Sequence, residues 1–159
     1  MKISPRSCCA MLGLSGLAMG ISIAGALAAP APQAYCAKAI NDDELRGAPH
    51  ALAPAIKQLF HISGAYAAQT TRYRCAGGKV MLCNEGANLP CGKANIRRSL
   101  PGATAWCKEK PNSSFIPTVA TGHDTIYTWH CANDVATPGD PVRKIDARGF
   151  FADYWRQLP

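Results

Sequence analysis

Six cysteines follow an apolar N-terminal segment, and together these two features constrain the chain more than anything else in its sequence. Lys2 and Arg6 precede a Gly- and Ala-rich run from Cys8 to Ala29, which contains Ala26-Leu27-Ala28 near its end. A basic start, a hydrophobic middle and a small-residue ending, in this order, are typical of a secretory signal peptide. We therefore predict a signal peptide at residues 1–28 and a periplasmic or secreted mature protein.

A retained membrane anchor is the alternative interpretation, because an apolar run of this length can span a bilayer. Gly and Ser residues interrupt the run repeatedly, however, and Pro30 and Pro32 follow it. These features favour a cleaved leader over an anchor. We expect no transmembrane segment in the mature chain.

Cleavage after Ala28 leaves an even number of cysteines, which in an exported chain predicts three disulfides. Their spacing contains no Cys-x-x-Cys pair and matches no zinc ribbon or zinc finger. We therefore expect structural disulfides, no bound metal and no cofactor. The cysteines concerned are Cys36, Cys75, Cys83, Cys91, Cys107 and Cys131.

A β-hairpin is predicted at residues 71–83, where two strand-like runs flank a glycine pair. In a two-residue turn, Cys75 lies opposite Val80 and Cys83 lies opposite Arg72. Because side chains alternate along a strand, the two cysteines then face opposite sides of the hairpin. They should not bond to each other.

Six cysteines can pair in fifteen ways, and the sequence alone does not choose among them. Our first suggestion is a bond between Cys83 and Cys91, which closes a short loop. Our second is Cys75 with Cys131, because both end strand-like segments that could be neighbours. The third pair is left open.

The N-terminal part of the mature chain is predicted to be helical. Residues 29–40 form a Pro/Ala-rich spacer that we expect to be poorly ordered. Asn41 and Glu44 have the spacing of a helix-capping box, and Pro49 ends that helix. A second helix is predicted to begin near Pro54 and to end at Ser63-Gly64.

The rest of the chain is predicted to add strands and a final helix to one domain at residues 41–159. The fold class is α+β: a small antiparallel sheet with an N-terminal helical lead-in and a C-terminal helix, stapled by three disulfides. The further elements are a loop at residues 84–101, a helix at Ala103–Lys110, a strand at Thr125–Cys131, a loop at Asn133–Pro141, a strand at Val142–Ala147 and a helical face formed by Phe151, Tyr154, Trp155 and Leu158.

The mature chain is modestly basic. Removal of Lys2 and Arg6 from a total of 17 leaves 15 basic against 10 acidic side chains, and the surplus lies after residue 71. Such a field favours an anionic or protein partner in the envelope, although it also serves solubility alone. The longest basic runs are pairs such as Arg97-Arg98, and we find no DNA-binding motif.

Few residues suggest catalysis. His123 and Asp124 lie together in a polar loop, where a histidine beside a carboxylate could act as a general base. His130 and Arg74 are weaker candidates, the arginine as a phosphate ligand. A simple turn into the following strand is the favoured interpretation of His123 and Asp124. No nucleophile elbow, phosphate loop or zincin motif is present.

Three functions remain open. A Tyr-x-Cys strand at Tyr73, a Thr121-Gly122 turn and the Tyr127 strand resemble short stretches of bacterial periplasmic inhibitors of C-type lysozyme. The six-cysteine pattern departs from that group, so no function or site is carried over. We favour an exported, non-catalytic binding or inhibitor-type domain of unknown ligand. The alternatives are a small secreted ribonuclease-like hydrolase that uses His123, and a structural envelope protein.

Overall fold

The computed structural model describes residues 31–62 and 66–159. The predicted signal peptide lies outside the described residues, as does the predicted helix end at Ser63-Gly64. The elements, in chain order, are α1 (Pro32–Ala39), β1 (Asp42–Gly47), the short helix η1 (His50–Leu52), α2 (Ala53–Phe60), β2 (Thr71–Ala76), β3 (Lys79–Asn84), α3 (Pro101–Glu109), α4 (Thr118–Thr121), β4 (Tyr127–Ala132), β5 (Val135–Pro141) and β6 (Arg156–Gln157).

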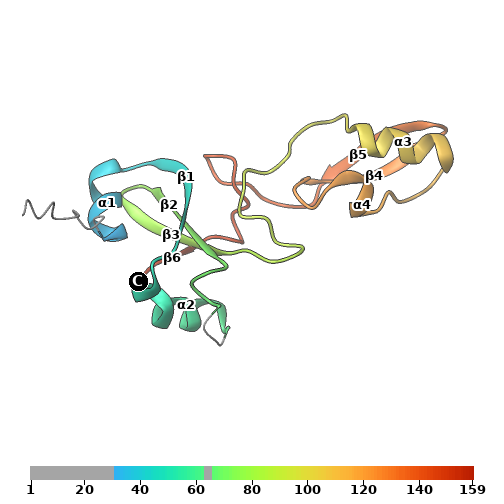
Figure 1. Cartoon of the computed structure of the whole chain (residues 1–159). Coiled ribbons are helices and arrows are strands. Elements are labelled where there is room, and N and C mark those ends of the chain that lie inside the picture. The colour runs from blue at the N-terminus through green and yellow to red at the C-terminus, as the bar shows by residue number, and fades with distance from the viewer. Residues whose placement is uncertain (1–30, 63–65) are drawn as a thin grey trace, which may run out of the picture.

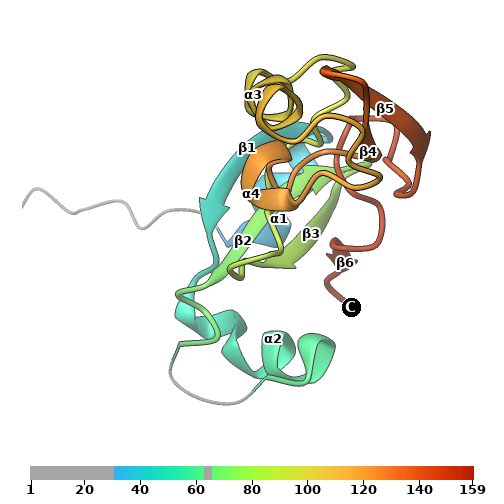
Figure 2. The ribbon, with the colours of Figure 1, turned by 90° about the vertical axis from the view of Figure 1, so that its right-hand side faces the viewer.

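These elements form two lobes, which are joined by long connecting segments (Figure 1). The basal lobe contains α1, α2 and an antiparallel sheet of strand order β1-β2-β3-β6. The distal lobe, residues 97–142, contains α3, α4 and the β4–β5 hairpin, and it faces the viewer in Figure 2. This architecture confirms the α+β class, the small antiparallel sheet and the three disulfides. No helix in the described ranges is long and apolar enough to cross a membrane.

The β2–β3 hairpin divides the basal core into two parts. Tyr73 and Leu82 pair on one face, where they pack with Ile56 of α2. The opposite face carries Cys83, which packs with Phe150 and Trp155 from the end of the chain. A strand that is apolar on both faces is buried on both sides, and the sheet therefore lies between the helices and the C-terminal segment.

The predicted hairpin register is confirmed. Cys75 pairs with Val80 and Cys83 pairs with Arg72. The turn residues Gly77 and Gly78 both have positive φ angles, +60° and +77°, which glycine adopts without steric cost. The two cysteines consequently point to opposite faces of the sheet and have different partners.

The disulfides are Cys36–Cys75, Cys83–Cys91 and Cys107–Cys131. The suggested Cys83–Cys91 bond is therefore confirmed, and the suggested Cys75–Cys131 bond is wrong. Cys75 lies in the basal sheet, whereas Cys131 lies on β4 in the distal lobe. The two strands belong to separate sheets, so their cysteines cannot meet.

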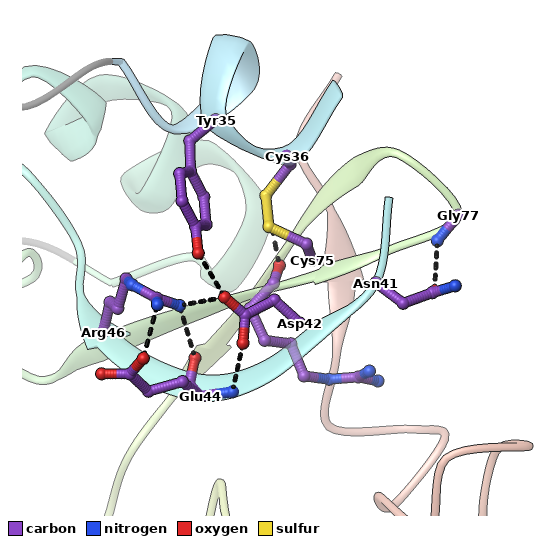
Figure 3. The surroundings of a disulfide bond; sticks show 9 residues. Tyr35, Cys36, Asn41, Asp42, Glu44, Arg46, Cys75 and Gly77 are labelled. Atoms are coloured by element: carbon purple, nitrogen blue, oxygen red, sulfur yellow. Dashed lines mark hydrogen bonds and ion pairs between the residues drawn. A yellow bond between two sulfur atoms is a disulfide. The ribbon is translucent and has the colours of Figure 1, made fainter. Parts of the chain in front are cut away.

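The Pro/Ala-rich segment is ordered from Pro32 onward, contrary to the expected spacer, because helix α1 is held by Cys36. Cys36 is fully buried and bonded to Cys75. Figure 3 shows that Tyr35, its neighbour, donates a hydrogen bond to the Asp42 carboxylate, which also pairs with Arg46 at 2.8 Å. The Tyr35 hydrogen bond lowers the pKa of Asp42, and it raises the pKa of Tyr35.

The helix predicted at Asn41 is wrong, because this segment forms the edge strand β1. Asp42 Oδ1 accepts the backbone N–H of Glu44 at 3.0 Å, a local turn that uses the same residue types as a helix cap. The Asn41 side chain accepts the Gly77 N–H from the neighbouring hairpin. With Pro49 so close, a helix here would be very short, whereas β2 offers backbone partners along the segment.

The predicted second helix, the Ala103 helix and the Thr125 strand correspond to α2, α3 and β4. Pro54 and Pro101 occupy the first turns of their helices, where the missing N–H costs nothing. On β4, Trp129 and Cys131 are buried while Thr128 and His130 are exposed, as the predicted alternation requires. The connection between β3 and α3 contains no named helix or strand.

Two assignments near the C-terminus are wrong. The expected loop at Asn133–Pro141 contains strand β5, and the expected strand at Val142–Ala147 is irregular except for an isolated pairing of Ile145. Pro138 is tolerated in β5 because this is an edge strand, which needs fewer backbone donors.

The expected C-terminal helix is a single turn followed by strand β6, which pairs with β3. Phe151 and Trp155 have helical spacing and are both buried, but Phe150 is buried as well. Adjacent buried aromatics do not fit one face of a helix. Pairing with β3 instead extends the sheet and seats Leu158 in the helix-side core.

Candidate functional site

The distal lobe has a core of its own. Leu100, Ala103 and Cys107 from the α3 region pack against Trp129 and Cys131 of β4. The Cys107–Cys131 disulfide joins this helix to the strand. A small apolar cluster braced by a covalent bond gives the lobe a rigid framework on which a recognition surface can be built.

A pocket of about 190 Å³ opens on this lobe and is the candidate functional site. It collects side chains from the loop before α4, from α4 itself, from the turn into β4, from β4 and from the segment after β5. We call it the distal pocket; the residues used below are Phe115, Thr118, His123, Tyr127, Val142 and Arg143.

Backbone hydrogen bonds bring these separate segments together. Ile116, next to Phe115, donates its N–H to the carbonyl of Trp129 at 2.9 Å, so the loop runs along the outer edge of β4. Val142 donates its N–H to the carbonyl of Ile126 at 2.8 Å. The walls of the distal pocket are therefore held on both sides of one strand.

The base of the distal pocket is fixed by Trp129. Its ring is buried, and its indole N–H donates to Thr125 Oγ1 at 3.0 Å. The Tyr127 ring meets the Trp129 ring edge-on, with centroids 6.4 Å apart. Such an arrangement is favourable for aromatic pairs and restricts both rings.

Two exposed apolar side chains line the distal pocket. Phe115 and Val142 are each 62% exposed. Single exposed apolar residues are ordinary, but two that line one concavity indicate an interaction surface. We call Phe115 and Val142 the apolar rim.

The electrostatic character of the distal pocket is basic. His123 and Arg143 line it, and no carboxylate does so among the described residues. The exposed Arg98 guanidinium lies 5.2 Å from the Tyr127 ring centroid. Arg143 donates to the Tyr154 hydroxyl, so its head group already has a partner within the protein.

The structure separates the predicted catalytic candidates. His123 lines the distal pocket, whereas Asp124 lines a different, open hollow with Lys93 and Arg97. No hydrogen bond joins His123 to Asp124 within the described part of the chain. His130 lies on the exposed face of β4, opposite in direction to Trp129, and it does not line the distal pocket.

Arg74 is not available to a substrate, because it is only 1% exposed. Its guanidinium lies over the rings of Phe150 and Trp155, which meet edge to face, and pairs with the Asp146 carboxylate. Arg74 is therefore a structural residue of the basal lobe. Within residues 31–62 and 66–159, no cluster of His, Cys, Asp or Glu side chains could hold a metal ion.

Sequence reasoning missed the apolar rim. Phe115 falls in a segment for which no element was predicted, and Val142 was expected in a strand of its own. The sequence signal for such a surface is the presence of large apolar residues in a segment outside the predicted core elements. Tyr127, on the predicted Thr125–Cys131 strand, is half-buried and lines the distal pocket.

Comparisons with known proteins do not assign this site. No protein-family model matches the chain, and no curated protein or solved structure is significantly similar to it.

Proposed function

We propose that this protein is an exported, non-catalytic binding or inhibitor-type domain that recognises its ligand through the distal pocket. The observation that carries the proposal is the apolar rim, which lines a concavity in a lobe braced by Cys107–Cys131. A preorganised surface loses little conformational entropy on binding, so it suits recognition. Export is supported by the leader-like segment and by three disulfides in a small chain.

The proposal is tested by affinity capture from envelope extract with three forms of the chain: wild type, Val142→Asp and Val135→Asp. Val135 is the matched control, because it is a 59% exposed valine of the same lobe that does not line the distal pocket. Both substitutions change the net charge equally. We expect a ligand that wild type and Val135→Asp retain and Val142→Asp loses. Equal retention by all three forms would refute the role of the distal pocket.

A ribonuclease-like hydrolase is the second candidate, and one observation favours it: His123 and Arg143 line the same pocket. Acid–base cleavage of RNA needs a second proton-transferring group within reach of the same phosphate. Among the described residues that line the pocket, His123 is the only histidine, and none is a carboxylate or a lysine. Cleavage of RNA by wild type but not by His123→Ala would establish this alternative.

A further inference from the structure

We infer that the ligand of the distal pocket is an acidic protein segment that inserts one apolar side chain beside Phe115, Tyr127 and Val142. This inference rests on the proposed function and adds the chemical class of the partner. Three properties of the site carry it: the size of the cavity, the apolar rim and the distribution of charge.

The cavity has the size for one side chain. Its volume is about 190 Å³, whereas pockets for whole small-molecule ligands are about 300–1,000 Å³. Protein interfaces concentrate their energy in single anchoring side chains that fill such small, well-packed pockets. The aromatic rings of Tyr127 and Trp129 form the apolar lining that an anchor of this kind requires.

The apolar rim extends the contact beyond the cavity. Phe115 and Val142 line the cavity, and each is 62% exposed to solvent. A small ligand confined to the cavity would leave these side chains in water. A polypeptide segment that crosses the opening would cover them, and burial of their apolar surface would stabilise the complex.

The charge around the opening selects an acidic segment. His123 and Arg143 line the pocket and the exposed Arg98 stacks on Tyr127, with no carboxylate among the described lining residues. Asp124 is not among the lining residues of the distal pocket, and it lines a separate hollow with Lys93 and Arg97. Carboxylates that flank the anchor would therefore meet the guanidinium groups of Arg143 and Arg98.

The same distribution disfavours a nucleic acid. A nucleic-acid site needs several cations that contact successive phosphates. Here the described cations at the opening are the guanidinium groups of Arg143 and Arg98, and the exposed apolar side chains of Phe115 and Val142 lie beside them. The surface is too apolar and too sparsely charged to follow a phosphate backbone.

The inference is tested by phage display. Random dodecapeptides are selected for binding to the complete mature chain with its disulfides formed. We expect selected peptides to carry one aromatic or large aliphatic residue flanked by Asp or Glu. For the best peptide, Val142→Asp should weaken binding about tenfold or more, because it places a charge at the anchor site, while Val135→Asp should not. Arg98→Gln should weaken binding by about two- to fivefold, as expected for a rim charge, and added salt should reduce the difference.

Each other outcome overturns the inference. Peptides rich in Lys or Arg, peptides that bind Val142→Asp as well as wild type, or no Val142-dependent peptide at all would contradict it. An RNA oligonucleotide that binds wild type and binds Val142→Asp more weakly would show that the pocket recognises a nucleic acid and not an acidic protein segment. Any of these can occur while envelope capture still depends on Val142, so failure of the inference is distinguishable from failure of the proposed function.

Discussion

The guanidinium of Arg74 lies over the rings of Phe150 and Trp155, which meet edge to face, at 4.1 and 4.6 Å from their centroids. Its Nη2 donates to the Asp146 carboxylate, which also accepts the backbone N–H groups of Arg148 and Phe150. This cluster binds the sheet to the C-terminal segment without a covalent link. The Asp146 charge and the two rings replace part of the hydration that Arg74 loses on the β-strand, and its buried Nε and Nη1 have no hydrogen-bond partner among the described residues.

Replacement of Asp146 by Asn should destabilise the protein by about 3 kcal/mol, because it leaves the buried Arg74 charge unpaired. Asparagine keeps an oxygen that can accept the two backbone N–H groups. The decrease in the free energy of unfolding therefore measures the effect of removing the charge. The free energy of urea unfolding measures it. Asp153→Asn, at an exposed site outside the described ion pairs, is the control. Equal stability of the two variants would contradict the prediction.

Acid should destabilise the basal lobe. Burial opposes ionisation of Asp146, but the N–H groups of Phe150 and Arg148 and the charge of Arg74 outweigh it and lower its pKa. The Arg148 and Lys93 contacts likewise lower the pKa of Asp43. A folded-state pKa below the unfolded value of about 3.9 means stability that is present above that pH and is lost as pH falls through the folded value.

The unfolding midpoint should therefore be nearly constant from about pH 7 to pH 5 and should fall below about pH 4. Asp146→Asn should show a smaller fall, because one of the responsible carboxyl groups is absent. Urea titrations at each pH, followed by circular dichroism, measure both curves. An unfolding midpoint that increases as the pH falls would contradict the prediction.

The three disulfides should contribute unequally to stability. Cys36 and Cys75 are 39 residues apart, whereas Cys83 and Cys91 are 8 apart. In the chain-entropy model the longer loop restricts the unfolded state more, by about 1.4 kcal/mol. Replacing Cys36 and Cys75 by Ser should therefore lower the free energy of unfolding more than replacing Cys83 and Cys91. The opposite order would show that native-state packing dominates.

Replacement of Thr125 by Val should destabilise the distal lobe by about 1–3 kcal/mol, because the buried indole N–H of Trp129 then loses its acceptor. Valine has nearly the same shape, so packing changes little. Thr137→Val on β5 is the control, since the Thr137 hydroxyl bonds only within its own strand. Thermal unfolding compares the two variants, and equal melting temperatures would contradict the prediction.

Export can be checked by mass spectrometry of the full chain expressed in a Gram-negative host. We expect the periplasmic or secreted product to lack residues 1–28. Alkylation before and after reduction should then find no free thiol among the six remaining cysteines. A full-length product retained in the cytoplasm would contradict the predicted leader.

The parts of the fold that depend on local alternation could be predicted. The hairpin register followed from a glycine pair between two runs of period two, and it placed Cys75 and Cys83 on opposite faces. The alternation of buried Trp129 and exposed His130 on β4 followed in the same way. Such signals lie within a few residues of each other, so no tertiary information is needed to read them.

The parts of the fold that depend on partners distant in the sequence could not be predicted. Asn41 and Glu44 have the spacing of a capping box, but in the structure the Glu44 N–H bonds to Asp42 in an edge strand, and only the presence of β2 decides between the two. The distal pocket joins Phe115 to Val142 through backbone bonds to β4 that no local pattern encodes. Arg74 was assigned a phosphate-binding role because the sequence does not show that Phe150 and Trp155 lie against it.

The order of the disulfides has a consequence for how the chain matures. Each bonded cysteine is joined to the next one along the chain, so the three loops neither overlap nor enclose one another. A polypeptide that enters an oxidising compartment with its N-terminus first can close each bond as soon as the second thiol emerges. Pairing in order of appearance gives the native connectivity, so an oxidase is sufficient and an isomerase that reshuffles wrong bonds is not required.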